Sequence, residues 1–397
     1  MNSDRPKRFL LSIIGWTVLM SCQISRGEPE KPSHVGEPGE WGVLQSFEAV
    51  IEPASSLLLD PDYTNPQSVW TLPPEWTRDQ IKTFLEEAGV GGEFSEAFLS
   101  QGNVLRSGDG TLFFPPAPLI QRITPITRNR LYTALGQWQA NSFEAYPFSL
   151  GANRIETLAK LAPHTFSQEL ISLADTLIYE NEDGLLFADY PLICQQIPDP
   201  ESRIAFAKLL LRTPTLMVNL RFPGQSDIEK MRRYWSSDGQ NSSSLPLLDS
   251  LIDSAKEEKP ASIDLVYLLP PVPKSLLFTF TRSDSGVGSS FPDCFWTALN
   301  FFSSEPNQRY FDPVLKTVVE EDWSPVSPPY QFGDLMIFYA PDLSTARHAC
   351  NYIADDIVFT KNGRSMFRPW VLQRLEKVRA EYGATSDDQI KVYRPKR

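Results

Sequence analysis

The most informative stretch of the chain is Asp293-Cys294-Phe295-Trp296-Thr297-Ala298-Leu299-Asn300. Its apolar residues predict a helix that carries Cys294 in its first turn. His348 follows later, in a run of residues that favours a strand. A thiolate attacks carbonyls, and an imidazole can activate the thiol and protonate a leaving amine. A helix N-terminus also stabilises a thiolate, because it adds partial positive charge. The two residues therefore predict thiol chemistry.

The length and composition of the chain limit how many domains it can form and which partners it can bind. A chain of 397 residues predicts two domains, or three. Its hydrophobic fraction of 41% and aromatic fraction of 12% are enough for packed cores. The net charge is −12 and no basic patch alternates with aromatic residues, so we expect no nucleic-acid partner.

The N-terminus predicts an export signal over residues 1–27. Basic residues precede an apolar run, Phe9 to Ser21, that is shorter than the ~20 residues of a membrane span. Cleavage after Ser25-Arg26-Gly27 is one alternative, a lipidated Cys22 is a second, and an uncleaved anchor helix is a third. We expect an exported protein of the periplasm, cell envelope or extracellular space. The mature chain would have no membrane span, and Cys22 could carry a lipid anchor.

The number and spacing of the cysteines and histidines limit which disulfides and metal sites the chain can form. Cys194, Cys294 and Cys350 remain after processing, so at least one thiol is unpaired or paired between chains, and a Cys194–Cys350 disulfide is an alternative. The three histidines are scattered, and no Cys-x-x-Cys or His-Glu-x-x-His motif occurs. We therefore expect no metal site and no cofactor.

Periodicity divides the chain near its middle. Helical spacing recurs up to about residue 260, as in Thr77 to Glu87 with Thr77 as N-cap, so the first region is predicted to be mostly helical. The prolines of Leu268 to Pro273 indicate a stiff linker.

Beyond this linker, short β-prone runs alternate with helices, which predicts an α+β fold. The expected strands are Leu276–Thr281, Leu335–Tyr339, His348–Ile353 and Ile357–Thr360, and the expected helices after the Cys294 helix are Pro313–Glu320 and Phe367–Tyr382. The predicted organisation is a signal at 1–27, a flexible spacer at 28–40, a mostly helical domain at 41–260, an α+β domain at 275–383 and a tail at 384–397.

The order of motifs in the α+β domain resembles the NlpC/P60 branch of papain-like cysteine peptidases. Asp293-Cys294 opens a helix, Phe332 to Phe338 is similar to the family's Gly-Asp turn entering an apolar strand, and Arg347 to Asp356 is similar to its histidine strand. The resemblance covers about residues 285–365. It implies a compact papain-like domain, with a helix packed on a small antiparallel sheet.

The resemblance also implies roles. Cys294 would be the nucleophile, His348 the general base and then the acid, and the backbone N–H of Cys294 an oxyanion donor. Asn362 is our choice for the group that orients the imidazole, with Thr360 and Lys361 as alternatives. The expected reaction is amide hydrolysis or acyl transfer on a peptide, including cell-wall peptides of the peptidoglycan type.

Two departures from the family pattern support a rival interpretation. Phe295-Trp296 follows the cysteine where the family has small residues, and Ala349-Cys350 follows the histidine. The rival is a non-catalytic binding or structural protein of the cell envelope, whose papain-like domain is inactive. An accessible Cys294 thiolate in contact with His348 favours the enzyme, and a buried, neutral Cys294 favours the rival.

Overall fold

The computed structural model describes residues 31–108, 110–151, 153–160, 162, 164–181, 184–222, 228–256, 261–282, 291–311 and 314–396. The predicted export signal, its cleavage sites and Cys22 lie outside these residues. Within them, no helix is both long and apolar enough to cross a bilayer.

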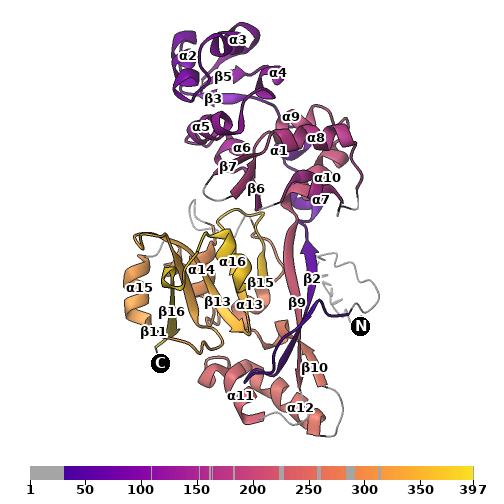
Figure 1. The fold of residues 1–397 in the computed structure, drawn as a ribbon, viewed down its shortest axis with the longest axis vertical. Helices are drawn as coiled ribbons and strands as arrows, with labels where there is room; N and C mark the ends of the chain where they lie inside the picture. Colours follow the sequence, from indigo (N-terminus) through magenta and orange to yellow (C-terminus); the bar gives the residue numbers. More distant parts are fainter. Residues whose placement is uncertain are drawn as a thin grey trace, which may run out of the picture.

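A long antiparallel ribbon runs through the centre of the molecule (Figure 1). It pairs β2 (Val43–Ile51) with β9 (Thr213–Phe222) over the full length of β2. The short strand β1 (His34–Val35) adds to β2, and β10 (Ala261–Asp264) adds to β9. The predicted flexible spacer at 28–40 is therefore wrong for its described part, because β1 is hydrogen-bonded into this sheet.

A lobe is inserted between the two strands of the ribbon, over residues 52–212, and has its own hydrophobic core. Its strands are β3 (Trp70–Leu72), β4 (Asn103–Ser107), β5 (Gly110–Phe114), β6 (Phe148–Gly151), β7 (Tyr179–Asn181) and β8 (Gly184–Phe187), in two three-stranded sheets. Its helices are η1 (Ser55–Leu58), α1 (Pro61–Thr64), α2 (Arg78–Glu87), α3 (Glu93–Gln101), α4 (Ala117–Ile120), α5 (Pro125–Leu135), α6 (Ser142–Ala145), α7 (Ile155–Lys160), α8 (Gln168–Thr176), α9 (Tyr190–Cys194) and α10 (Pro200–Leu211).

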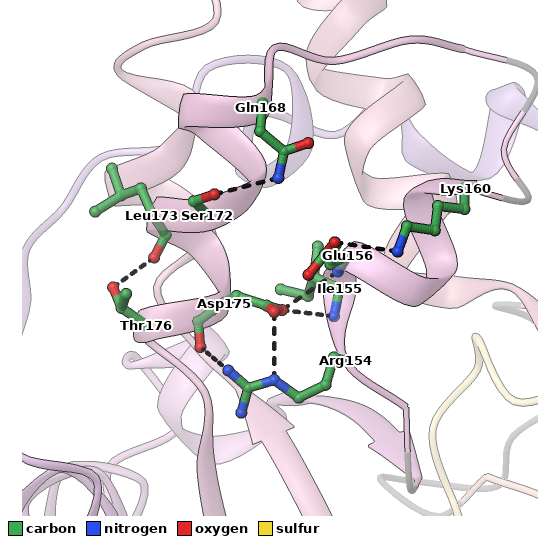
Figure 2. A network of polar contacts seen from close by, with 9 residues as sticks. All are labelled: Arg154, Ile155, Glu156, Lys160, Gln168, Ser172, Leu173, Asp175 and Thr176. Carbon is green, nitrogen blue, oxygen red and sulfur yellow. Dashed lines mark hydrogen bonds and ion pairs between the residues drawn. The ribbon is translucent and has the colours of Figure 1, made fainter.

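Side-chain caps fix where helices of this lobe begin. Thr77 and Gln80 form a capping box at the start of α2, which confirms the predicted N-cap. Asp175, near the end of α8, accepts the backbone N–H of Ile155 at 2.7 Å and so caps the start of α7 (Figure 2). Arg154 pairs with the same carboxylate, at 3.3 Å from Nε to Oδ2. These contacts join two helices that are short and could not stand alone.

The C-terminal half is built on a six-stranded antiparallel sheet with the order β11-β16-β12-β13-β14-β15. Helix α14 (Cys294–Leu299) and the central ribbon pack on one face of the sheet, and α16 (Leu375–Glu381) packs on the other. The strands are β11 (Trp323–Pro325), β12 (Leu335–Tyr339), β13 (Ala346–Ala354), β14 (Ile357–Lys361), β15 (Trp370–Arg374) and β16 (Ile390–Pro395). The other helices are η5 (Gln308–Tyr310), α15 (Leu315–Asp322) and η6 (Asp387–Gln389).

The main core crosses the predicted domain boundary. Ribbon residues, helices α11 (Ile228–Ser236) and α12 (Leu245–Lys256), and the six-stranded sheet share one apolar cluster. The predicted linker Leu268–Pro273 is wrong, because η4 (Leu265–Leu268) and α13 (Pro271–Leu276) occupy it and Leu268 is fully buried. Proline at the first position of α13 starts a helix there, since that position needs no N–H donor. The region 41–260 is thus not one helical domain.

Some of the helices and strands predicted for the C-terminal half are confirmed, and others are wrong. The strand Leu335–Tyr339 is confirmed as β12, and the general α+β class is what the structure has. The strand predicted at Leu276–Thr281 is wrong, because Leu276 ends α13. The helix predicted at Phe367–Tyr382 is strand β15 followed by α16. The predicted tail at 384–397 contains β16, which lies between β11 and β12.

Candidate functional site

Cys294 stands at the start of α14, as the sequence predicts. Asp293 is the N-cap and accepts the backbone N–H of Trp296 at 2.9 Å. The helix packs on β13 and β14 and leaves Cys294 only 5% exposed. The backbone groups of Ala349 and Phe295 are close enough to the thiol to lower its pKa, but burial has the larger effect. Cys294 therefore has the expected helical position, but it lies under packed structure.

His348 lies on β13, directly opposite Phe338 of β12. Its ring stacks on Tyr382, with 3.9 Å between centroids and an angle of 8° between planes. Its Nε2 is hydrogen-bonded to Thr360 Oγ1 at 2.9 Å, and its Nδ1 has no hydrogen-bond partner. The side chain is 0% exposed.

The structure does not join the two residues into a thiol–imidazole pair. Side chains alternate along β13, so Ala349 and Asn351 face α14, whereas His348 and Cys350 face α16. The thiol lies near the backbone of Ala349, just after His348, but no hydrogen bond connects it to the imidazole. Cys294 and His348 are neighbours in space that contact opposite sides of the sheet.

Burial holds both groups neutral. Desolvation, with a smaller effect from the Asp293 carboxylate, raises the pKa of the Cys294 thiol to about 12. Desolvation lowers the pKa of His348 to about 3. The partial charge of the short helix α14 does not offset the burial of the thiol. The protein therefore holds a neutral thiol and a neutral imidazole, whereas an active pair would be a thiolate beside an imidazolium.

Thr360, and not Asn362, bonds directly to the imidazole. Thr360 Oγ1 donates to Asn362 Oδ1 at 3.2 Å, so Oγ1 accepts the N–H of His348 Nε2. Asn362 is thus one bond further away, and its Nδ2 donates to Gln373 and to Glu381 at 3.1 and 2.9 Å. This assignment leaves His348 Nδ1 as a buried lone pair without a donor.

Lys361 is a residue beside Cys294 that sequence reasoning considered only as an alternative. It is 0% exposed, and its Nζ donates to the carbonyls of Gly363 and Ser365 at 2.8 Å each. Burial lowers its pKa to about 7, although Asp293 and Cys294 act in the other direction. The sequence does indicate this burial. Lys361 lies two residues after the apolar Phe359, at the end of a predicted strand, and residues two apart in a strand face the same side of the sheet.

The other two described thiols, Cys194 and Cys350, do not pair with each other. Cys194 and Cys350 are buried and unpaired, so the alternative of a disulfide between them is wrong. They lie in different cores, Cys194 in the inserted lobe and Cys350 in the α16 face of the sheet. Among the residues that the structure describes, no group of three metal-ligating side chains is close enough to hold an ion.

A cavity of about 550 Å³ lies at the opposite end of α14 from Cys294. It is bounded by the end of α14, the segment that follows it, the edge strand β11 and the end of the neighbouring strand β16. Neither Cys294 nor His348 lines it. Its walls consist of Gln240, Ala298, Leu299, Phe301, Phe302, Ser303, Tyr310, Glu321, Asp322, Trp323, Gly333, Asn351, Pro395 and Lys396.

Comparison with known proteins assigns no family to this geometry. No protein-family model, curated protein or solved structure matches the chain. The resemblance to NlpC/P60 peptidases therefore stays a prediction that rests on the order of a few motifs.

Proposed function

We propose that this chain is an exported, non-catalytic binding protein of the cell envelope, whose papain-like C-terminal half has an inactive thiol site. One observation carries the proposal: Cys294 is 5% exposed, His348 is 0% exposed, and the 550 Å³ cavity lies at the other end of α14. A nucleophile must reach a substrate carbonyl, and a buried neutral thiol has no such access. The export assignment rests on the predicted signal at 1–27.

Structural roles can explain why a cysteine and a histidine occupy positions 294 and 348. Cys294 fills a buried position at a helix start, where a cysteine packs as a small apolar side chain. His348 stacks on Tyr382 and bonds to Thr360, so it joins α16 to β14. Neither role requires proton transfer. The side chains that would serve catalysis are used for packing.

A second candidate is the thiol hydrolase or acyltransferase that the sequence predicts. A specific observation favours it: Thr360 and Asn362 hold His348 in one orientation, while Nδ1 lacks a partner. Unsatisfied buried polar atoms are costly and often belong to functional sites. In this case the peptide segment beside Ala349 would have to move, so that the thiol proton could pass to Nδ1 before attack on an amide carbonyl.

Alkylation by iodoacetamide separates the two candidates. The full mature chain is treated across a pH series, and mass spectrometry locates the modified cysteine. The proposal predicts that Cys294 stays unmodified in the native protein and reacts after denaturation. Labelling of Cys294 below pH 7 that is lost in His348→Ala, but kept in the matched control His164→Ala, would establish the hydrolase instead. His164 is a suitable control because its side chain is exposed.

A further inference from the structure

The cavity beyond α14 combines aromatic walls with a few polar groups. Phe301, Tyr310 and Trp323 are buried side chains of its wall, and Phe302 is half-buried. Ser303 and Gln240 add a hydroxyl and an amide. Its volume of about 550 Å³ falls within the ~300–1,000 Å³ typical of small-molecule sites. The cavity lies at the side of the sheet marked by α15, β11 and the C-terminus in Figure 1.

The charges around the cavity favour an uncharged ligand. Asp322 forms an ion pair with Arg309, which balances its carboxylate. Exposed Glu321 and Lys396 are the other charged wall residues, one of each sign. A net charge near zero gives neither a cation nor an anion an electrostatic advantage.

A buried amide in the wall needs a hydrogen-bond donor. Asn351 Nδ2 donates to the carbonyls of Ala298 and Gly333 at 3.1 and 3.4 Å, which fixes the orientation of the amide. Its Oδ1 has no partner, and Asn351 is 1% exposed. Asn351 is one of the residues that line the cavity, and a ligand hydroxyl or amide N–H is the kind of donor that its oxygen lacks.

We infer that the cavity binds a neutral saccharide of one or two rings. The C–H faces of a sugar pack against aromatic walls, and its hydroxyl groups donate and accept hydrogen bonds without adding charge. In the described lining, the half-buried ring of Phe302 offers the aromatic surface, and Ser303 and Gln240 offer the polar groups. The inference rests on the proposed binding function and specifies its ligand.

The test uses the full mature chain and three neutral disaccharides: diacetylchitobiose, cellobiose and maltose. Binding is measured by isothermal titration calorimetry. Ser303→Phe places a large ring at the cavity wall, and Ser304→Phe is the matched control, because Ser304 is exposed and does not line the cavity. We expect saturable millimolar binding of at least one disaccharide, weakened at least tenfold, or about 1.4 kcal/mol, by Ser303→Phe and unchanged by Ser304→Phe.

Two results would overturn the inference. One is no saturable binding of any of the three disaccharides, and the other is binding that Ser303→Phe leaves unchanged. Iodoacetamide labelling of the same samples separates this failure from failure of the proposed function. An inert Cys294 without sugar binding refutes only the ligand class. A Cys294 that reacts below pH 7 in a His348-dependent way refutes the non-catalytic assignment, whatever the sugars do.

Discussion

The two ends of helix α14 differ in a way that decides the functional interpretation. The N-terminal end has the residues that suggest chemistry, Cys294 and its neighbours, but it is packed under β13 and β14. The C-terminal end opens on a cavity of about 550 Å³, whose described lining contains neither cysteine nor histidine. The contrast teaches that residue type alone does not make a reactive site, because a ligand must also have access.

Packing explains why one end is closed and the other is open. At the closed end, Trp370 bonds to Thr297 at 2.9 Å, and Lys361 lies over the Trp370 ring at 5.6 Å from its centroid. At the open end, Gly333 adopts a φ of +86° and lies against Phe302, where an added Cβ would come within 2.2 Å of the ring. A glycine therefore allows the aromatic wall of the cavity to pack as it does.

The largest effect is expected from Trp370→Ala at the closed end. Trp370 is 2% exposed, so removing its ring should lower the free energy of unfolding by about 3–5 kcal/mol. Trp370→Phe keeps most of the volume and loses the bond to Thr297, so it should cost roughly 1–2 kcal/mol. Urea unfolding measures both. Equal losses for the two variants would show that ring packing does not hold this end closed.

The pH dependence of stability is the second prediction. The folded pKa of His348 is about 3, below its ordinary value of about 6.5, so the folded state favours the neutral ring. This contribution is present above about pH 6.5 and is lost as pH falls toward 3, with a slope of up to about 1.4 kcal/mol per pH unit. His348→Gln should flatten the acid limb of a stability–pH curve measured by urea unfolding. An unchanged limb would mean that the ring accepts a proton in the folded protein.

A smaller effect is expected at the N-cap of α14. Asp293→Ala removes the acceptor for the Trp296 N–H and should cost about 1 kcal/mol of stability, whereas Asp293→Asn keeps a good cap and should cost less. Thermal unfolding of both variants gives the comparison. If Asp293→Asn were as damaging as Asp293→Ala, the charge of Asp293 and not its cap would stabilise this end.

The smallest effect is expected for Arg364→Ala. Arg364 pairs with Asp293 at 3.3 Å, but its side chain is 74% exposed, so the pair should contribute less than about 0.5 kcal/mol. Thermal unfolding at low and high salt checks this. A loss above about 1 kcal/mol would show that the 361–365 turn closes the Cys294 end by charge.

Local signals were readable in the sequence, and pairings between distant segments were not. Thr77 with Gln80 and Asp293 before Cys294 are caps within one turn, so the starts of α2 and α14 could be predicted. Strand β16 was missed because its neighbours, β11 and β12, are far away in the chain. Thr360 was passed over for Asn362 because the choice depends on which side chain faces His348 across two strands.

The cavity could not be predicted from the sequence either, because it also forms between segments that are distant in the chain. Its walls come from segments as far apart as Gln240 and Lys396, and no short motif spans them. The predicted linker failed because its prolines suit a first helical turn as well as an extended spacer. What a motif can specify is the type of a residue and its local element. Whether the residue is exposed depends on the whole core.

Whether Cys294 is permanently buried can be measured from the rate at which it reacts with a thiol reagent as the urea concentration increases. Mass spectrometry follows Cys294 separately from Cys194 and Cys350, which are buried as well. If Cys294 becomes reactive only when its core unfolds, the opening free energy from labelling should equal the free energy of global unfolding and fall with the same urea dependence. An opening free energy several kcal/mol smaller, with little urea dependence, would contradict the account and mean that Cys294 is exposed by a local motion.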